Sequence, residues 1–123
     1  MNNKLNIILK EVTSIQSGLL RFKNKEGQQN LHVKVAADSN CLHCLVAEDM
    51  PRITGKKIHL IQKYRNDYFF ISGSIAGEVQ HVAKVLSITI HKASWFVKKR
   101  KGSVTWFSEK HTYETTPQKM SVA

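Results

Sequence analysis

The 123-residue sequence has few of the residues that cross-link a small protein or interrupt its secondary structure. It contains two cysteines and two prolines, and it has nine acidic residues compared with nineteen basic ones. A chain of this length buries well over half of the surface that its unfolded form exposes, so it needs no disulfides to fold. Its apolar fraction of 41% is ordinary for a globular domain and excludes wholesale disorder.

Long hydrophobic runs are also missing. No stretch approaches the roughly 18 apolar residues that a membrane-spanning helix requires. The apolar stretch at the N-terminus is interrupted by Lys4 and Lys10, which is not typical of a secretory signal peptide. We therefore expect a cytoplasmic protein with no membrane span.

The common catalytic motifs are absent as well. The sequence has no G-x-S-x-G, H-E-x-x-H, P-loop or G-x-G-x-x-G, and its acidic residues are scattered. Cys41 and Cys44 form a lone C-x-x-C, a spacing found in redox motifs and in half of a zinc site. Their segment, CLHCLVA, has the pattern of a strand, on which residues three apart point to opposite faces. We therefore expect packed thiols, no metal, no cofactor and no enzymatic activity.

The hydrophobic pattern predicts one helix followed by short strands. Helical spacing is seen in Leu5, Ile8, Val12 and Ile15, and it predicts a helix over 3–17. From Gly18 onward, apolar and polar residues alternate in five or six segments at roughly ten-residue intervals. These features predict a mostly β fold, a small split or closed antiparallel barrel of five to six strands preceded by one N-terminal helix. We expect this single domain to cover 1–110 and residues 111–123 to form a disordered tail.

Positive charge is the most unusual property of the sequence. The formal net charge is +10, and two stretches, 50–66 and 79–108, contain no acidic residue. An excess of this kind attracts anions, although it also serves as a solubilising surface. The candidate anion-binding residues are Lys56, Lys57, Lys98, Lys99, Arg100 and Lys101.

Two aromatic pairs flank the run of four basic residues. They are Trp95-Phe96 and Trp106-Phe107. Arginine and lysine bind phosphate oxygens, and nucleobases stack on flat side chains. Trp95, Trp106 and Phe107 are therefore candidate stacking residues. The alternative is that these rings belong to the core and that the basic run is a solvated loop.

The order of these elements resembles a bacterial signalling family. The helix 7–15, the strand GLLRF and the segment LSITIHKASWFVKKRKGSV are similar to the YcgR-like N-terminal domain that precedes PilZ domains in flagellar-brake proteins. The resemblance implies a non-enzymatic signalling module that engages a protein partner. It also implies that cyclic di-GMP could join this contact through the basic run 98–101. The D/N-x-S-x-x-G motif of that family is absent from this sequence.

Two other binding functions remain open from the residues alone. An OB-like or SH3-like barrel could bind single-stranded nucleic acid, with Trp106, Phe107 and Tyr68 stacking on bases. A basic face could instead dock on an acidic protein. All three hypotheses require the two basic stretches to form one positively charged surface.

Overall fold

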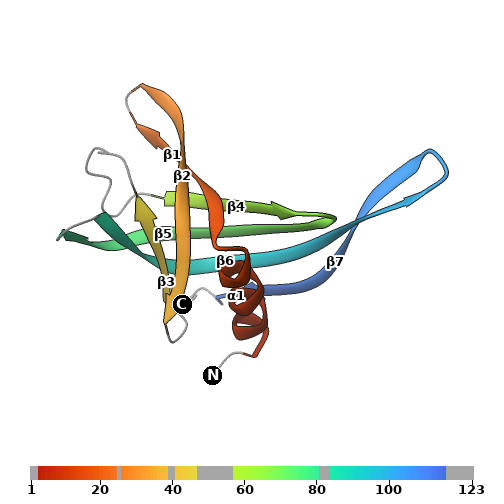
Figure 1. Cartoon of the computed structure of the whole chain (residues 1–123), viewed down its shortest axis with the longest axis horizontal. Helices are drawn as coiled ribbons and strands as arrows, with labels where there is room; N and C mark the ends of the chain where they lie inside the picture. Colours follow the sequence, from red (N-terminus) through yellow and green to blue (C-terminus); the bar gives the residue numbers. More distant parts are fainter. Residues whose placement is uncertain (1–2, 25, 39–40, 47–56, 81–83, 116–123) are drawn as a thin grey trace, which may run out of the picture.

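The computed structural model describes residues 3–24, 26–38, 41–46, 57–80 and 84–115. Within these ranges the chain forms one helix followed by seven strands (Figure 1). The elements are α1 (Asn3–Ile15), β1 (Ser17–Asn24), β2 (Gly27–Asp38), β3 (Cys41–Val46), β4 (Lys57–Tyr64), β5 (Asp67–Gln80), β6 (Lys84–Lys101) and β7 (Val104–Glu114).

The strands form a single antiparallel sheet that closes into a ring. The strand order is β3-β2-β1-β4-β5-β6-β7, and an additional pairing of β3 with β6 joins the ends of the six-stranded part. In the part of the chain that the structure describes, β7 pairs with β6 alone and lies outside the ring. The predicted mostly β fold with one N-terminal helix is confirmed, with a seventh strand added.

The helix packs its apolar stripe on the inside of the sheet. The buried side chains of this stripe are Leu5, Ile8, Leu9 and Val12. The helix ends at Ile15, two residues earlier than predicted, because Gln16 adopts a left-handed backbone conformation with φ of 69°. Among the described residues, no helix combines the length and the apolar character needed to cross a membrane.

One buried polar side chain connects the helix to the sheet. Gln62 on β4 is only 2% exposed, and its Nε2 donates to the carbonyl of Val12 at 3.0 Å and to that of Ser17 at 2.7 Å. The last carbonyls of a helix have no partner within the helix itself. The Gln62 amide therefore supplies a donor where α1 ends and β1 begins.

The longest strand, β6, pairs with three others. Its first part pairs with β3, almost all of it up to Val97 pairs with β5, and its second part, 92–101, pairs with β7. Strand β5 begins at Asp67, opposite Val97, so it pairs with β6 no further than this point. Beyond Val97, β6 and β7 continue as a two-stranded ribbon. In Figure 1 this ribbon projects away from the rest of the molecule. We name residues 98–107 the arm.

One alternative and one expectation drawn from the sequence are corrected at this point. The run 98–101 lies in strand β6 rather than in a loop. Strand β7 extends to Glu114, so residues 111–114, assigned above to a disordered tail, belong to the sheet. They pair with residues 92–95 of β6. The positions 116–123 lie outside the described residues.

A glycine permits one irregularity of the sheet. The register between β5 and β6 shifts at Ser72/Gly73 and again at Ile75/Gly77. A Cβ atom at Gly73 would lie 2.2 Å from the carbonyl oxygen of Thr89, far closer than contact allows. Any other residue at this position would push β5 and β6 apart.

The role of Gln62 can be tested by the substitution Gln62→Leu. The variant leaves the carbonyls of Val12 and Ser17 without this donor, so the free energy of unfolding should fall by about 1–3 kcal/mol. Urea denaturation measures this loss. The exposed Gln28 provides the control, because Gln28→Leu should change the same quantity much less. Equal losses in the two variants would contradict the assigned role.

Candidate functional site

The two sides of the sheet differ sharply in chemistry. On β4, the side chains of Ile58, Leu60 and Gln62 point inward and are buried, so Lys57 and Lys63 point outward. Directly paired residues of neighbouring strands have their side chains on the same side of a sheet. The registers therefore identify every residue on the outer side, the side that faces away from the core.

Four aromatic rings form a row on this outer side. Phe70 and Tyr68 come from β5, Phe96 from β6 and Phe107 from β7. Phe70 and Phe96 meet edge to face with ring centroids 6.0 Å apart, and Tyr68 and Phe107 do so at 5.1 Å. Tyr68 and Phe96 are direct strand partners, which joins the two pairs. Phe70 is 42% exposed and Phe107 is 55% exposed, so this aromatic row presents ring surface to solvent.

Cations flank the aromatic row, and the acidic Glu109 pairs directly with Phe96 on the same side. The Nζ of Lys63 lies 5.5 Å from the centroid of the Tyr68 ring. Lys98 is the direct strand partner of Phe107, and Arg100 follows two residues later on the same side. The arrangement places positive charge on two sides of the exposed rings. Cations near aromatic faces also interact favourably with the rings themselves.

The β4–β5 turn brings part of the first basic stretch to the start of the arm. The backbone N–H of Lys98 donates to the carbonyl of Asn66 at 2.8 Å. Lys63 and Arg65, which lie beside this turn, therefore neighbour the second basic stretch. Neither residue is among the anion-binding candidates predicted from the sequence, because this contact depends on pairing between distant segments.

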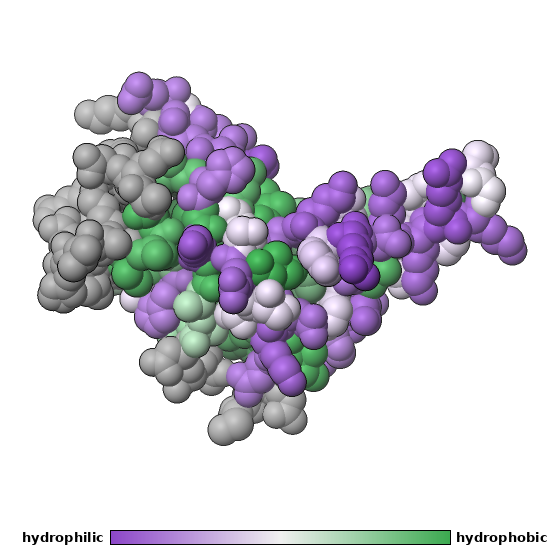
Figure 2. Space-filling view, viewed as in Figure 1, coloured by the Kyte–Doolittle hydropathy of each residue, from purple (hydrophilic) through white to green (hydrophobic). Residues whose placement is uncertain are grey.

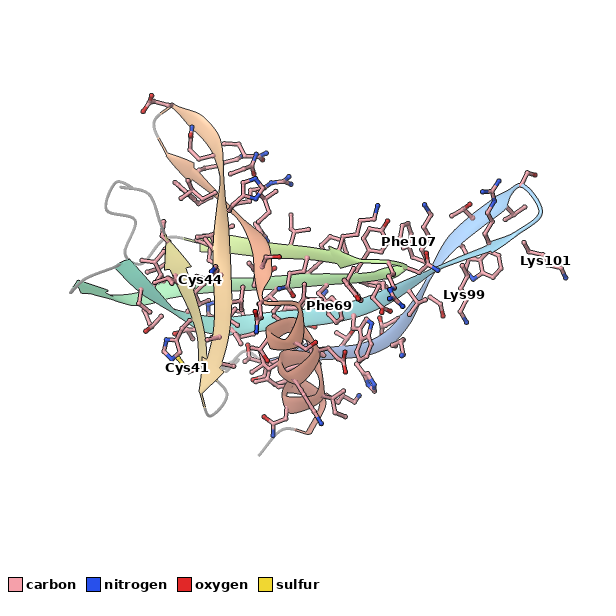
Figure 3. All side chains as sticks on the ribbon, in the orientation of Figure 1. Cys41, Cys44, Phe69, Lys99, Lys101 and Phe107 are labelled. Carbon is pink, nitrogen blue, oxygen red and sulfur yellow. The ribbon has the colours of Figure 1, made fainter. Side chains whose placement is uncertain are left out.

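The arm divides the basic run between its two faces. Lys98 and Arg100 share the outer side with Phe107, whereas Lys99 and Lys101 share the opposite face with Trp106. In Figure 3, Phe107 lies near the base of the arm and Lys101 nearer its tip. Figure 2 shows that hydrophilic residues cover most of the arm on the side in view. The four cations therefore do not converge on one point.

Lys57 lies on the outer side but at the other end of it. It pairs with Ser74, which pairs with Thr89, nine residues before Lys98 along β6. At the rise of a strand this separation is roughly 30 Å. The aromatic row lies between the two ends. Lys56 is outside the described residues, so its position relative to this surface is not assigned.

The three stacking candidates have different surroundings. Trp95 is 7% exposed, packs against Phe69 with centroids 5.1 Å apart, and donates from Nε1 to Asp67 Oδ1 at 3.1 Å. It is part of the core and is not available for stacking on a ligand. Trp106, at 43% exposure, and Phe107 both face solvent, on opposite faces of the arm.

Phe70 and Phe96 are not among the stacking candidates predicted from the sequence. The signal for Phe70 was present, because it alternates with Phe69 and Ile71, which share the buried parity of β5. The orientation of Phe96 depends on an irregularity in β6 that the alternating pattern did not reveal.

The cysteines have different environments and no bond between them. Cys44 is buried and Cys41 is half-buried, and both are free thiols. Burial raises the pKa of Cys44 from 9.0 to about 12. Within the described ranges, no three histidine, cysteine, aspartate or glutamate side chains are close enough to share a metal ion.

No protein-family model matches this chain, and no curated protein matches its sequence. Function must therefore be inferred from the geometry and chemistry of the outer side.

The thiol environments predict selective alkylation. The thiolate is the reactive form, so the raised pKa keeps Cys44 protonated and inert at about pH 8. Iodoacetamide should modify Cys41 alone in the folded protein and both cysteines in urea, as counted by mass spectrometry. Equally fast modification of Cys44 in the folded protein would contradict its burial.

Proposed function

We propose that this protein is a cytoplasmic, non-enzymatic binding module that holds single-stranded nucleic acid along the outer side of its sheet. The observation that carries the proposal is the exposed aromatic row with Lys63, Lys98 and Arg100 beside it. Every nucleobase has a face that stacks on an aromatic ring, and cations alongside follow the phosphate backbone. The row offers both kinds of contact.

The distribution of charge favours an extended ligand over a compact one. Lys57 and Lys98 lie roughly 30 Å apart on the same side, and the basic run alternates between two faces. A compact nucleotide such as cyclic di-GMP would contact only part of this charge. A flexible strand can run along the outer side and reach both ends. Cyclic di-GMP and a protein partner stay predictions of the family resemblance.

The exposed apolar surface supports the same proposal. Phe70 and Phe107 expose large rings to solvent, and Phe107 is the direct strand partner of Lys98. Contiguous exposed apolar surface is uncommon in proteins without a binding partner. Base stacking is indifferent to sequence, so we expect weak preference among bases.

The stacking role can be tested with Phe107→Ala. We expect a labelled 5′-hydroxyl oligothymidine of about 12 nucleotides to bind about 5- to 150-fold more weakly, because one stacked base contributes about 1–3 kcal/mol. Fluorescence anisotropy measures the affinity. The matched control is Trp106→Ala, which removes an exposed ring from the opposite face of the same arm and should leave affinity nearly unchanged. Equal effects of the two substitutions, in folded variants, would refute the stacking role.

The electrostatic role can be tested through salt dependence. The logarithm of the binding constant should fall linearly with the logarithm of salt concentration, by about 0.7 per neutralised phosphate. Lys98→Gln should make this slope shallower by about that amount. Lys99→Gln, the adjacent lysine on the other face, should not change it. A slope that is indifferent to both substitutions, or an affinity indifferent to salt, argues against phosphate contacts at Lys98.

A further inference from the structure

A second feature of the outer side lies at the end away from the arm. It is an open cleft of about 580 Å³. Clefts that hold small ligands are typically about 300–1,000 Å³. The described residues that line it are Arg21, Phe22, Lys23, Gln28, Lys57 and His59, and none of them is acidic.

Strand register groups the four basic side chains of this cleft. Arg21 on β1 and His59 on β4 are direct partners. Lys23 and Lys57 lie two residues further along these antiparallel strands, in the same direction in space. Direct partners have Cβ atoms about 5 Å apart, and residues two apart along a strand are about 7 Å apart. Arg21 and His59 therefore lie side by side on the outer side, and Lys23 and Lys57 line the cleft at the same end of these strands.

Hydrogen bonds orient two of the four groups. The Nε of Arg21 donates to Asn30 Oδ1 at 3.0 Å, which fixes the guanidinium while its terminal nitrogens remain able to donate. His59 Nδ1 lies 3.1 Å from Ser72 Oγ. When the Ser72 hydroxyl donates to Nδ1, the Nε2 of His59 carries the proton and can donate to a ligand.

The charge of the cleft selects the kind of ligand. Three permanent cations that line one cleft repel one another, and a bound dianion would offset this repulsion. A phosphate monoester has a second pKa near 6 and carries close to two negative charges at neutral pH, whereas an internal phosphodiester carries one. Arginine binds phosphate oxygens in a fork and lysine binds them as a point charge.

We propose that the cleft formed by Arg21, Lys23, Lys57 and His59 binds a phosphate monoester, either the terminal phosphate of a strand or the phosphate of a free mononucleotide. Ser72, which contacts His59 of the cleft, lies on the outer side of β5. Phe70 lies two residues from Ser72 on the same side, roughly 7 Å away. A base attached to the bound phosphate could therefore reach the aromatic row. For the terminal phosphate of a nucleic acid strand the inference rests on the proposed function, whereas for a free mononucleotide it does not.

The test compares ligands with and without a phosphate monoester, and cyclic di-GMP serves as a nucleotide that has only phosphodiesters. Labelled oligothymidines with a 5′-phosphate, a 3′-phosphate or hydroxyls at both ends are titrated by anisotropy, and unlabelled adenosine monophosphate, adenosine and cyclic di-GMP by calorimetry. We expect one phosphorylated end to tighten strand binding at least about 10-fold, because hydrogen bonds to charged groups are among the strongest. We also expect adenosine monophosphate to bind at least about 10-fold more tightly than adenosine.

Matched substitutions locate the effect. Arg21→Gln and Lys57→Gln should each abolish most of the gain from the monoester. Lys34→Gln removes an exposed lysine of β2 that does not line the cleft and should leave the gain intact. Thermal unfolding of each variant checks that these exposed substitutions keep the fold.

The outcomes separate this proposal from the proposed function. If no phosphate monoester improves the binding of an oligothymidine or of adenosine, the cleft is not a phosphate site. The proposed function is then tested by the binding of the oligothymidine with hydroxyls at both ends. If adenosine monophosphate binds through Arg21 and Lys57 while no strand binds, the cleft stands and the proposed function fails. Binding of cyclic di-GMP more tightly than the monophosphate, lost in the same variants, would overturn the preference for a monoester.

Discussion

The pairing of one long strand with three partners is the constraint on which the rest of the structure depends. Strand β6 closes the ring through β3, supports β5 and then carries β7. Because β6 is continuous from the ring into the arm, the orientation of the arm is fixed by the ring. Its faces are determined by the register of the ring from which it grows.

Two irregularities decide which residues face outward. Before His91 the buried residues of β6 are even-numbered, as in Ile88 and Ile90, and after it Ala93 and Trp95 are buried. The extra residue in β6 thus reverses the parity of the strand and turns Phe96 and Lys98 outward. A second register shift, opposite Trp95/Phe96, reverses the parity of β7 in the same way. It aligns Phe107 with Lys98 and makes Lys110 the extra residue of β7, with its Nζ 4.1 Å from the centroid of the Trp95 ring.

The sequence predicted the helix, the alternating strands and the barrel-like fold because these depend on local periodicity. It could not predict the arm, because an 18-residue strand is far longer than the common five or six residues and the basic run lacks an apolar alternation. The two adjacent polar residues His91 and Lys92 did mark the change of parity. Their meaning becomes clear only once the partners on β5 are known.

The cleft was beyond prediction for a different reason. Arg21 and Lys23 are separated by more than thirty residues from Lys57 and His59, and only the β1–β4 register brings them together. Neither pair forms a motif by itself. The acid-free stretch 50–66 identified Lys57 as a candidate, but it could not reveal that its basic neighbours come from β1 rather than from the arm.

The spacing of the cations differs between the two ends of the outer side. At the cleft, four basic groups from β1 and β4 line one opening, while at the arm Lys98 and Arg100 follow each other along one strand. Concentrated charge suits a single dianion, and charge spaced along a strand suits a series of monoanionic diesters. A nucleic acid with a phosphorylated end has both. If such a strand binds, this asymmetry gives it a direction, with its terminal phosphate in the cleft, its first bases over Phe70 and Tyr68, and its later phosphates along the arm.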